Sequence, residues 1–357
     1  MKTKIDFGEF KKAVKEVNKL KNTSDINTLD NIKLIAKDEY IKIIKSNLTS
    51  ILQVKCYAEN EEPGEIILPN STIKLLENIK KNQELTITDE YIQLGKKKIE
   101  FKDITLEDFP KIEFKANNKK FSIAENELYR LLEVSYATAK DETRPILTGI
   151  NIKNNKFAAI DGYRLSIRES DKFTSDLNIT MSNEQWTALL KIINKKSNNT
   201  INVYTDCDNK YLRYEINDNI ELESELMEGE YIKYESIIPE TKESNTTLHI
   251  DDDEIMDKFN LINKLNDKNV YTEININDII EIKAKDQENI IKDELKGNVK
   301  GENILIAFNN KYLIDSFKYY EKDKFNIYLY SSVSPIVVTQ DNKSLELILP
   351  VRLNKAA

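Results

Sequence analysis

The sequence contains few of the residues that interrupt secondary structure, form disulfide bridges or bind metal ions. Its 357 residues include 8 glycines, 7 prolines, 2 cysteines and 1 histidine. No Gly/Ser-rich or Pro-rich stretch is present to act as a flexible linker, so the parts of the chain should pack rigidly end to end. Cys56 and Cys207 lie far apart and form no CxxC pair. We therefore expect two core thiols in a reducing cytoplasm.

Membrane and catalytic signals are also missing. No apolar run reaches the ~18 residues that span a bilayer, and the opening residues lack the apolar core of a signal peptide, so we expect a cytoplasmic protein. There is no GxxxxGK[ST] loop and no HExxH motif. His249 has no second histidine or nearby cysteine with which to share a metal, so it is interpreted as a surface or interface residue. We expect no enzyme activity, no cofactor and no metal.

Two short motifs could be mistaken for sites. The acidic run 251–254 lacks the glycine and the spaced ligands of a calcium loop, and at the start of a predicted helix its carboxylates favour capping. Asp161 and Gly162 are more simply interpreted as a turn between strands than as a catalytic aspartate.

The charge balance limits how the chain could hold nucleic acid. It carries 53 basic and 61 acidic residues, a net charge of −8. A protein that grips DNA by neutralising phosphates is usually basic. This chain therefore either avoids DNA or retains it by something other than bulk charge.

The periodicity shows one plan three times. A short strand followed by an amphipathic helix is predicted at 4–20, 119–137 and 246–265, and a second helix at 69–79, 181–193 and 308–320. Ser182 with Gln185 forms a capping box, and Asn70 and Asn309 are predicted N-caps. The sequence thus predicts an α+β fold of three similar domains, 1–118, 119–243 and 244–357. The simplest alternative is that the repeats form only a curved scaffold.

The remaining segments alternate as strands do. Leu52, Val54 and Cys56 are predicted to share one face of a strand. Hairpins are predicted around the turns at 217–219 and 277–278. Each predicted domain therefore contains two helices and antiparallel strands.

Several segments resemble one protein family. Residues 137–150, 158–169, 229–239, 302–317 and 347–353 are similar to the beta subunit of bacterial DNA polymerase III, the sliding clamp. The chain departs from the family at Ile232, where proline is usual, and in the additional residues 354–357. The resemblance implies that two chains close head to tail into a ring, with sheets outside and helices lining the hole. It also implies a processivity factor that encircles duplex DNA without reading sequence, and that needs a separate clamp loader.

The predicted DNA-facing residues are basic and concentrate on helices. Lys11, Lys15 and Lys19 recur at i, i+4 and i+8, a like-charge stripe that disfavours the helix unless phosphates lie opposite. The resemblance adds Lys140 and Arg144. The full predicted set is Lys11, Lys12, Lys15, Lys19, Lys74, Lys80, Lys81, Lys140, Arg144, Lys191, Lys195, Lys196, Lys311, Lys318 and Lys322.

The resemblance also implies two protein-binding surfaces. One is an apolar cleft for short peptides of the replicative DNA polymerase, the loader and other partners. Its predicted residues are Leu147, Tyr163, Arg164, Leu165, Pro239, Tyr312, Val333, Leu347, Leu349, Pro350, Val351 and Arg352. The other is the homodimer interface, where Leu261 and Ile262 would meet Ile99 and Phe101 of the partner chain. Two rivals remain: a monomeric clamp-derived peptide adaptor, and an enzyme built on a repeat scaffold.

Overall fold

The computed structural model describes residues 1–22, 26–80, 82–102, 109, 116–141, 143–266, 270–320 and 324–353. The chain forms two compact units. The first unit comprises Met1–Leu132 and Lys172–Glu228, and the second comprises Glu133–Asp171 and Gly229–Ala357. No helix in the described ranges is long and apolar enough to cross a membrane.

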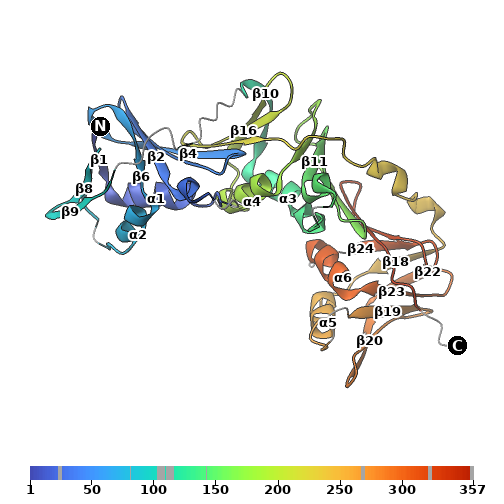
Figure 1. Ribbon diagram of the computed structural model, residues 1–357. Helices are drawn as coiled ribbons and strands as arrows, with labels where there is room; N and C mark the ends of the chain where they lie inside the picture. The colour runs from blue at the N-terminus through green and yellow to red at the C-terminus, as the bar shows by residue number, and fades with distance from the viewer. Residues whose placement is uncertain are drawn as a thin grey trace. The chain divides into compact units, whose positions relative to one another are not determined.

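The first unit is built on antiparallel sheets with helices packed against them (Figure 1). Its helices are α1 (Phe7–Val17), α2 (Asn70–Glu77), α3 (Glu125–Leu132) and α4 (Asn183–Ile192), with the 3-10 helix η1 (Asn27–Asp30). A five-stranded sheet has the order β5 (Glu59–Glu62), β1 (Lys2–Asp6), β7 (Glu84–Thr88), β8 (Tyr91–Leu94), β9 (Lys97–Glu100). The strand β14 (Asn178–Met181) also belongs to the first unit.

The larger sheet of the first unit has eight strands. Their order is β10 (Asn118–Ala124), β15 (Thr200–Thr205), β16 (Tyr211–Ile216), β17 (Ile220–Glu225), β4 (Ser50–Tyr57), β3 (Tyr40–Ser46), β2 (Ile32–Lys37), β6 (Gly64–Leu68). Strand β17 pairs with β4, so that Leu222 lies opposite Leu52 and both are fully buried. The alternating pattern of β4 therefore places one face in the core and leaves the other more exposed, as predicted.

Helix α1 shows how an amphipathic sequence pattern leads to a helix that packs against a sheet. Asp6 caps it by accepting the backbone N–H of Glu9, and its apolar stripe is buried, including Phe10 and Val17. Full burial of such a side chain contributes about 1.5–3 kcal/mol. The opposite face carries the charged residues, so packing fixes which face of α1 is available to a ligand.

The second unit also contains two sheets. In one, the strands of this unit run in the order β11 (Ile150–Lys153), β12 (Lys156–Ile160), β13 (Arg164–Glu169), β26 (Ser344–Ile348), β25 (Ile336–Thr339), β24 (Phe325–Leu329), β18 (Thr246–Ile250), β22 (Gly297–Gly301). The other sheet has the order β21 (Ile290–Leu295), β20 (Ile280–Lys285), β19 (Tyr271–Ile276), β23 (Ile304–Asn309).

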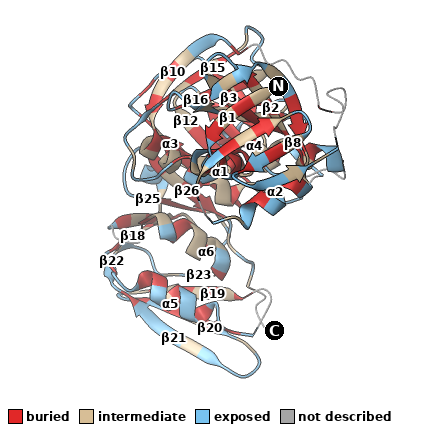
Figure 2. Cartoon of the chain, turned by 90° about the vertical axis from the view of Figure 1, so that its left-hand side faces the viewer, coloured by how far each residue is buried: buried red, intermediate tan, exposed pale blue. Residues whose placement is uncertain are grey.

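Helices of the second unit cover its core (Figure 2). They are α5 (Ile255–Ile262) and α6 (Asn310–Phe317), with the 3-10 helices η3 (Glu133–Ala137), η4 (Pro145–Thr148), η5 (Tyr234–Ile237), η6 (Thr241–Glu243) and η7 (Lys318–Tyr320). Helices α5 and α6 lie side by side (Figures 1 and 2), and the rings of Phe259 and Phe317 meet edge to face at 5.4 Å. Such aromatic packing adds to the burial term and fixes the spacing of the two helices.

The predicted helices and hairpins are confirmed, and the caps are confirmed in part. The hydroxyl of Ser182 accepts the N–H of Gln185, and the amide oxygen of Asn309 accepts that of Lys311. The predicted cap at Asn70 is wrong, because Pro69 takes the extended cap position and Asn70 begins the helix. The backbone N–H of Asn70 instead donates to the side chain of Asn31 at 3.0 Å.

The thiols differ from the prediction. Cys56 is partly buried, whereas Cys207 is exposed, so the expectation of a core thiol at Cys207 is wrong. Cys207 lies in the turn between β15 and β16, where side chains point to solvent.

The two compact units divide the residues predicted as the second domain. Sheet pairing supplies the physical reason, because β17 is hydrogen-bonded to β4, and β13 to β26. Strand β17 of the predicted second domain thus shares a sheet with β4 of the predicted first domain, and β13 shares one with β26 of the predicted third domain. The three-domain division therefore stays a prediction based on the repeated elements.

Candidate functional site

A tight turn positions Arg164 at the start of β13. Between β12 and β13, Asp161 accepts the backbone N–H groups of Tyr163 and Arg164, at 3.0 and 3.1 Å. Gly162 has φ +88°, a left-handed conformation that favours glycine. This is the turn predicted from the sequence, and Asp161 serves to build it.

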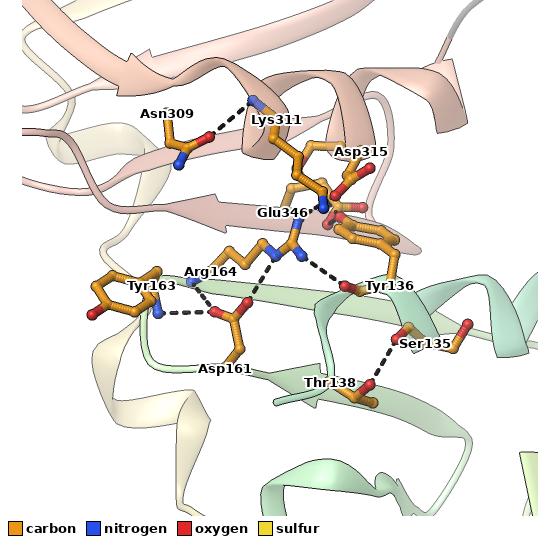
Figure 3. A network of polar contacts seen from close by, with 11 residues as sticks. Ser135, Tyr136, Thr138, Asp161, Tyr163, Arg164, Asn309, Lys311, Asp315 and Glu346 are labelled. Atoms are coloured by element: carbon orange, nitrogen blue, oxygen red, sulfur yellow. Dashed lines mark hydrogen bonds and ion pairs between the residues drawn. The ribbon is translucent and has the colours of Figure 1, made fainter. Parts of the chain in front are cut away.

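The guanidinium of Arg164 is held by three different segments (Figure 3). Its Nε donates to Asp161 at 3.0 Å, Nη1 to Asp315 of α6 at 2.6 Å, and Nη2 to the carbonyl of Tyr136 in η3 at 2.8 Å. The ring of Tyr312 lies 4.5 Å from the guanidinium carbon. Arg164 is 5% exposed, and burial of a charge is tolerated because it is paired this completely.

A pocket of about 460 Å³ opens beside this cation, and we call it the Arg164 pocket. Tyr163 is 60% exposed, and its ring stacks with that of Tyr312 at 6.1 Å. The lining residues are Thr138, Ala139, Lys140, Asp141, Asp161, Tyr163, Arg164, Asn263, Val270, Asn309, Lys311 and Tyr312. An open aromatic wall next to a fixed cation can bind an apolar side chain and orient a nearby polar group.

The predicted cleft residues divide into a buried floor and an exposed rim. Leu147, Leu165 and Leu347 are buried together in one apolar cluster with Tyr234. They support the surface from beneath, so direct contact with a ligand falls to their exposed neighbours. Those that are exposed or partly exposed are Tyr163, Pro239, Tyr312, Val333, Leu349, Pro350, Val351 and Arg352.

Backbone bonds fix part of this rim. The N–H of Leu349 donates to the carbonyl of Tyr163 at 2.9 Å, and that of Val351 to Ala307 at 2.7 Å. The residues after β26 thus run beside the Arg164 turn. Val333 lies in the turn between β24 and β25 and is 68% exposed. The structure therefore brings together Tyr163, Arg164, Tyr312 and Leu349, whereas Val333 is not one of the residues that line the Arg164 pocket.

The predicted DNA-facing residues lie mostly on the surface. Lys12, Lys15, Lys74, Lys80, Lys140, Arg144, Lys191, Lys195, Lys196, Lys311 and Lys318 are exposed. Lys12 pairs with Glu9 at 2.8 Å and Lys19 with Glu16 at 2.5 Å. Lys81 and Lys322 lie outside the described residues.

The predicted dimer contacts need one correction. Leu261 is 55% exposed on α5, but Ile262 is fully buried in the core of its own unit. On a helix, successive residues point in different directions, so one faces solvent while the other faces the core. Ile262 is therefore unavailable to a partner chain. Ile99 and Phe101 are partly exposed, on and just after β9.

The motifs set aside as non-catalytic are structural. His249 is exposed on β18, with its Nδ1 2.6 Å from the side-chain oxygen of Asn326. Asp252 accepts the N–H of Glu254 at 3.1 Å and pairs with Lys258 of α5 at 2.7 Å. Asp252 thus orders the turn before α5, but Glu254 occupies the N-cap position and no side-chain cap hydrogen bond forms, so the predicted capping is not confirmed.

One cluster in the described part of the chain has metal-ligating groups close together, namely Asp206, Cys207 and Asp208. One carboxylate oxygen of Asp206 already accepts the N–H groups of Lys210 and Tyr211. The cluster is a surface turn and gives no reason to assign a metal.

Sequence reasoning missed the partners of Arg164 and the buried pair beneath it. Tyr136 and Asp315 hold the guanidinium, and Arg168 forms a fully buried ion pair with Glu346. A local signal exists for Glu346, because a charge in the largely apolar strand β26 needs a partner. Nothing local indicates which partner it meets.

Repeated strand–helix units joined through antiparallel sheets define the fold class as that of DNA clamps. The DNA polymerase sliding clamp of Bacillus subtilis matches with a TM-score of 0.89 at 20% identity, over 99% of this chain and 100% of that one. The DNA polymerase III subunit beta of Pseudomonas aeruginosa matches with a TM-score of 0.89 at 21% identity, with the same coverage.

Sequence comparison narrows the class to one family. The models of the DNA polymerase III beta subunit match at residues 122–233 for its central domain and 235–352 for its C-terminal domain. The beta sliding clamp of Rickettsia bellii is 27% identical over 354 residues, covering 92% of this chain and 93% of that protein. The chain belongs to the DNA polymerase III beta subunit family.

Proposed function

We propose that this chain is a DNA sliding clamp, a non-catalytic cytoplasmic processivity factor that encircles duplex DNA as a homodimer. Membership of the beta subunit family carries the proposal. The charge pattern supports it, since the chain is acidic overall yet exposes lysines on α1, α2, α4 and α6. Scattered lysines attract the phosphate backbone without reading sequence, which permits sliding.

Retention by encirclement differs from retention by affinity in how it responds to salt and to DNA ends. Phosphate contacts weaken steeply as salt rises, because counterion release drives them. Escape from a closed ring requires opening a protein interface, whose apolar part salt screens little. The bound lifetime should therefore depend on whether the DNA has an end.

The test loads the protein onto circular duplex DNA with an ATP-driven clamp loader and measures its lifetime before and after linearisation, at matched salt. We expect a long lifetime on the circle and rapid loss by sliding after the cut. A linear duplex blocked at both ends by tightly bound protein is the control, and it should restore retention. Equal lifetimes on circular and open linear DNA would show that the protein grips DNA and would overturn the proposal.

Partners are proposed to bind at the Arg164 pocket and the adjoining rim. The pocket combines the stacked rings of Tyr163 and Tyr312 with a buried cation, and the exposed Leu349 lies on the adjoining rim. This chemistry fits a short peptide with one or two large apolar side chains and a polar backbone or carboxylate near Arg164. After ordering costs, such a peptide should bind at roughly micromolar affinity, which lets polymerase, loader and other partners exchange.

Calorimetry with a synthetic peptide from the cognate replicative polymerase tests this site. Leu349→Ala should weaken binding by about tenfold, the cost of losing one largely buried leucine contact. Leu48→Ala removes a similarly exposed leucine in the first unit and should change nothing. Unchanged affinity for the Leu349 variant would place the peptide elsewhere.

A further inference from the structure

Tyr136 connects the Arg164 pocket to a buried polar cluster through three different contacts. Its carbonyl accepts from Arg164 Nη2 at 2.8 Å, and its ring centroid lies 5.1 Å from the guanidinium carbon. Its hydroxyl donates to the carboxylate of Glu346 (Figure 3). The same hydroxyl lies 3.3 Å from the hydroxyl of Ser316. One residue of η3 therefore contacts both the pocket cation and the interior.

Glu346 is a fixed acceptor for that hydroxyl. It is fully buried on β26, opposite Ser166 of β13, and forms an ion pair with Arg168, which is also fully buried. The guanidinium of Arg168 packs on the ring of Tyr319 at 3.6 Å and donates to the carbonyl of Ile167 at 2.8 Å. Both strands belong to one sheet, so the carboxylate cannot move without breaking a buried pair.

The other supports of Arg164 are less firmly held. Asp161 belongs to the same turn as Arg164 and moves with it. The side chain of Asp315 on α6 is 27% exposed, so water competes for its carboxylate. The carbonyl of Tyr136 is the support tied to the interior, because the hydroxyl of the same residue is bonded to Glu346.

We propose that Tyr136 is a positioning residue for the peptide site: its bond to Glu346 sets the place of η3 and thereby the guanidinium of Arg164. The proposal rests on the peptide-binding function assigned to the Arg164 pocket. Val134 and Ala137 keep η3 packed in the core, but removing the hydroxyl loses the bond that ties Tyr136 itself to Glu346, so its carbonyl fixes the guanidinium less firmly. The peptide then meets a cation whose position must be ordered on binding, at a cost in affinity.

The experiment is a double-mutant cycle of Tyr136→Phe and Arg164→Ala, read by calorimetry with the synthetic polymerase peptide. We expect Tyr136→Phe to weaken binding about fivefold in the native background, an effect of the size of one ordinary net hydrogen bond. In the Arg164→Ala background the same change should alter the Kd by less than about twofold. A merely structural role of Tyr136 would lower affinity equally in both backgrounds, and that result would overturn the proposal.

Two control variants isolate the bond. Tyr204→Phe removes a hydroxyl that donates to Glu215 at 2.8 Å in the first unit, and it should leave peptide affinity unchanged. Ser316→Ala removes the other polar neighbour of the Tyr136 hydroxyl and should also leave it unchanged. A loss in Ser316→Ala equal to that in Tyr136→Phe would contradict the role given to Glu346. Thermal melting and solution mass verify that each variant is folded.

A second readout needs no peptide. The chain has six arginines, so the Nε–H signals of an arginine-labelled protein can be assigned by substitution. The Arg164 signal should shift and exchange faster with solvent in Tyr136→Phe, while the Arg213 signal stays in place. If the native protein fails to bind peptide, the proposed function of the pocket fails, and the Arg164 signal still tests the positioning. An unchanged Arg164 signal overturns the positioning whatever the peptide does.

Discussion

The Nζ of Lys11 lies 3.0 Å from the backbone carbonyl oxygen of Glu77, the last residue of α2. The same ammonium donates to the carbonyl of Ile79, also at 3.0 Å. Carbonyls at a helix end lack partners within the helix and carry partial negative charge, so a lysine there is stabilising. Lys11 thus ties α1 to α2. Lys15, one turn further along α1, is exposed and has no hydrogen bond or ion pair among the described residues.

This difference predicts opposite results for two neighbouring lysines. Lys15→Ala should reduce the slope of log affinity against log salt for a linear duplex by about 1, with an unchanged melting temperature. Lys11→Ala should instead destabilise the fold by about 1 kcal/mol, because two carbonyls lose their donor. Fluorescence titrations at several salt concentrations, together with thermal melts, measure both effects.

Lys300→Ala is the matched control for these lysines. Lys300 is exposed on strand β22, away from any helix, and its loss should leave the salt slope unchanged. The same decrease in slope for Lys300 and Lys15 would mean that DNA responds to total charge and that α1 has no particular role.

The ring proposal predicts that one exposed leucine controls the oligomeric state. Leu261→Asp should convert the dimer to monomers, because a carboxylate buried at an interface without a partner costs several kcal/mol. Leu261 is 55% exposed in the isolated chain, so the melting temperature of the monomeric unit should not fall. Solution mass by light scattering measures the change.

Leu305→Asp provides the comparison for the interface variant. Leu305 is 48% exposed on β23, and the substitution should leave the dimer intact. A native protein that is already monomeric at micromolar concentration would contradict the ring and favour the monomeric adaptor.

The thiols predict a large difference in chemical reactivity. Burial raises the pKa of Cys56 to about 11, so little thiolate forms near neutral pH, whereas Cys207 is exposed. Because the thiolate is the nucleophile, a thiol reagent at pH 7.5 should modify Cys207 rapidly and Cys56 slowly. Peptide mapping of the modified protein, with Cys207→Ser as the control, measures the two rates. Comparable rates would show that Cys56 is more accessible than its burial indicates.

Sequence patterns predicted the elements of this fold better than the contacts between them. Residues near one another carry the period of α1 and the capping of α4 by Ser182, so a local rule suffices for both. The ion pair of Arg168 with Glu346 depends on the register of β13 against β26, which no local pattern encodes. Ile262 was misplaced for a related reason, because family resemblance gives a segment and not the direction in which each side chain points.

Glu223 predicts that the stability of the first unit depends on pH. It lies on β17, where burial raises the pKa of its carboxyl to about 7, against the opposing effect of Arg213, whose Nε is 4.0 Å away. A pKa raised in the folded state means that the folded chain binds a proton more tightly than the unfolded chain. The resulting stabilisation is complete below the ordinary glutamate pKa and is lost as the pH rises through about 7.

The titration of Glu223 should therefore lower the melting temperature of the native protein at pH 8 relative to pH 5.5. Glu223→Gln cannot ionise, so it should reduce that difference and stabilise the protein chiefly at pH 8. Glu225→Gln, at the exposed end of the same strand, is the control and should leave the difference unchanged. Thermal melts at both pH values compare the three proteins. A stabilisation by Glu223→Gln that is equal at pH 5.5 and pH 8 would mean that the carboxyl does not titrate in this range.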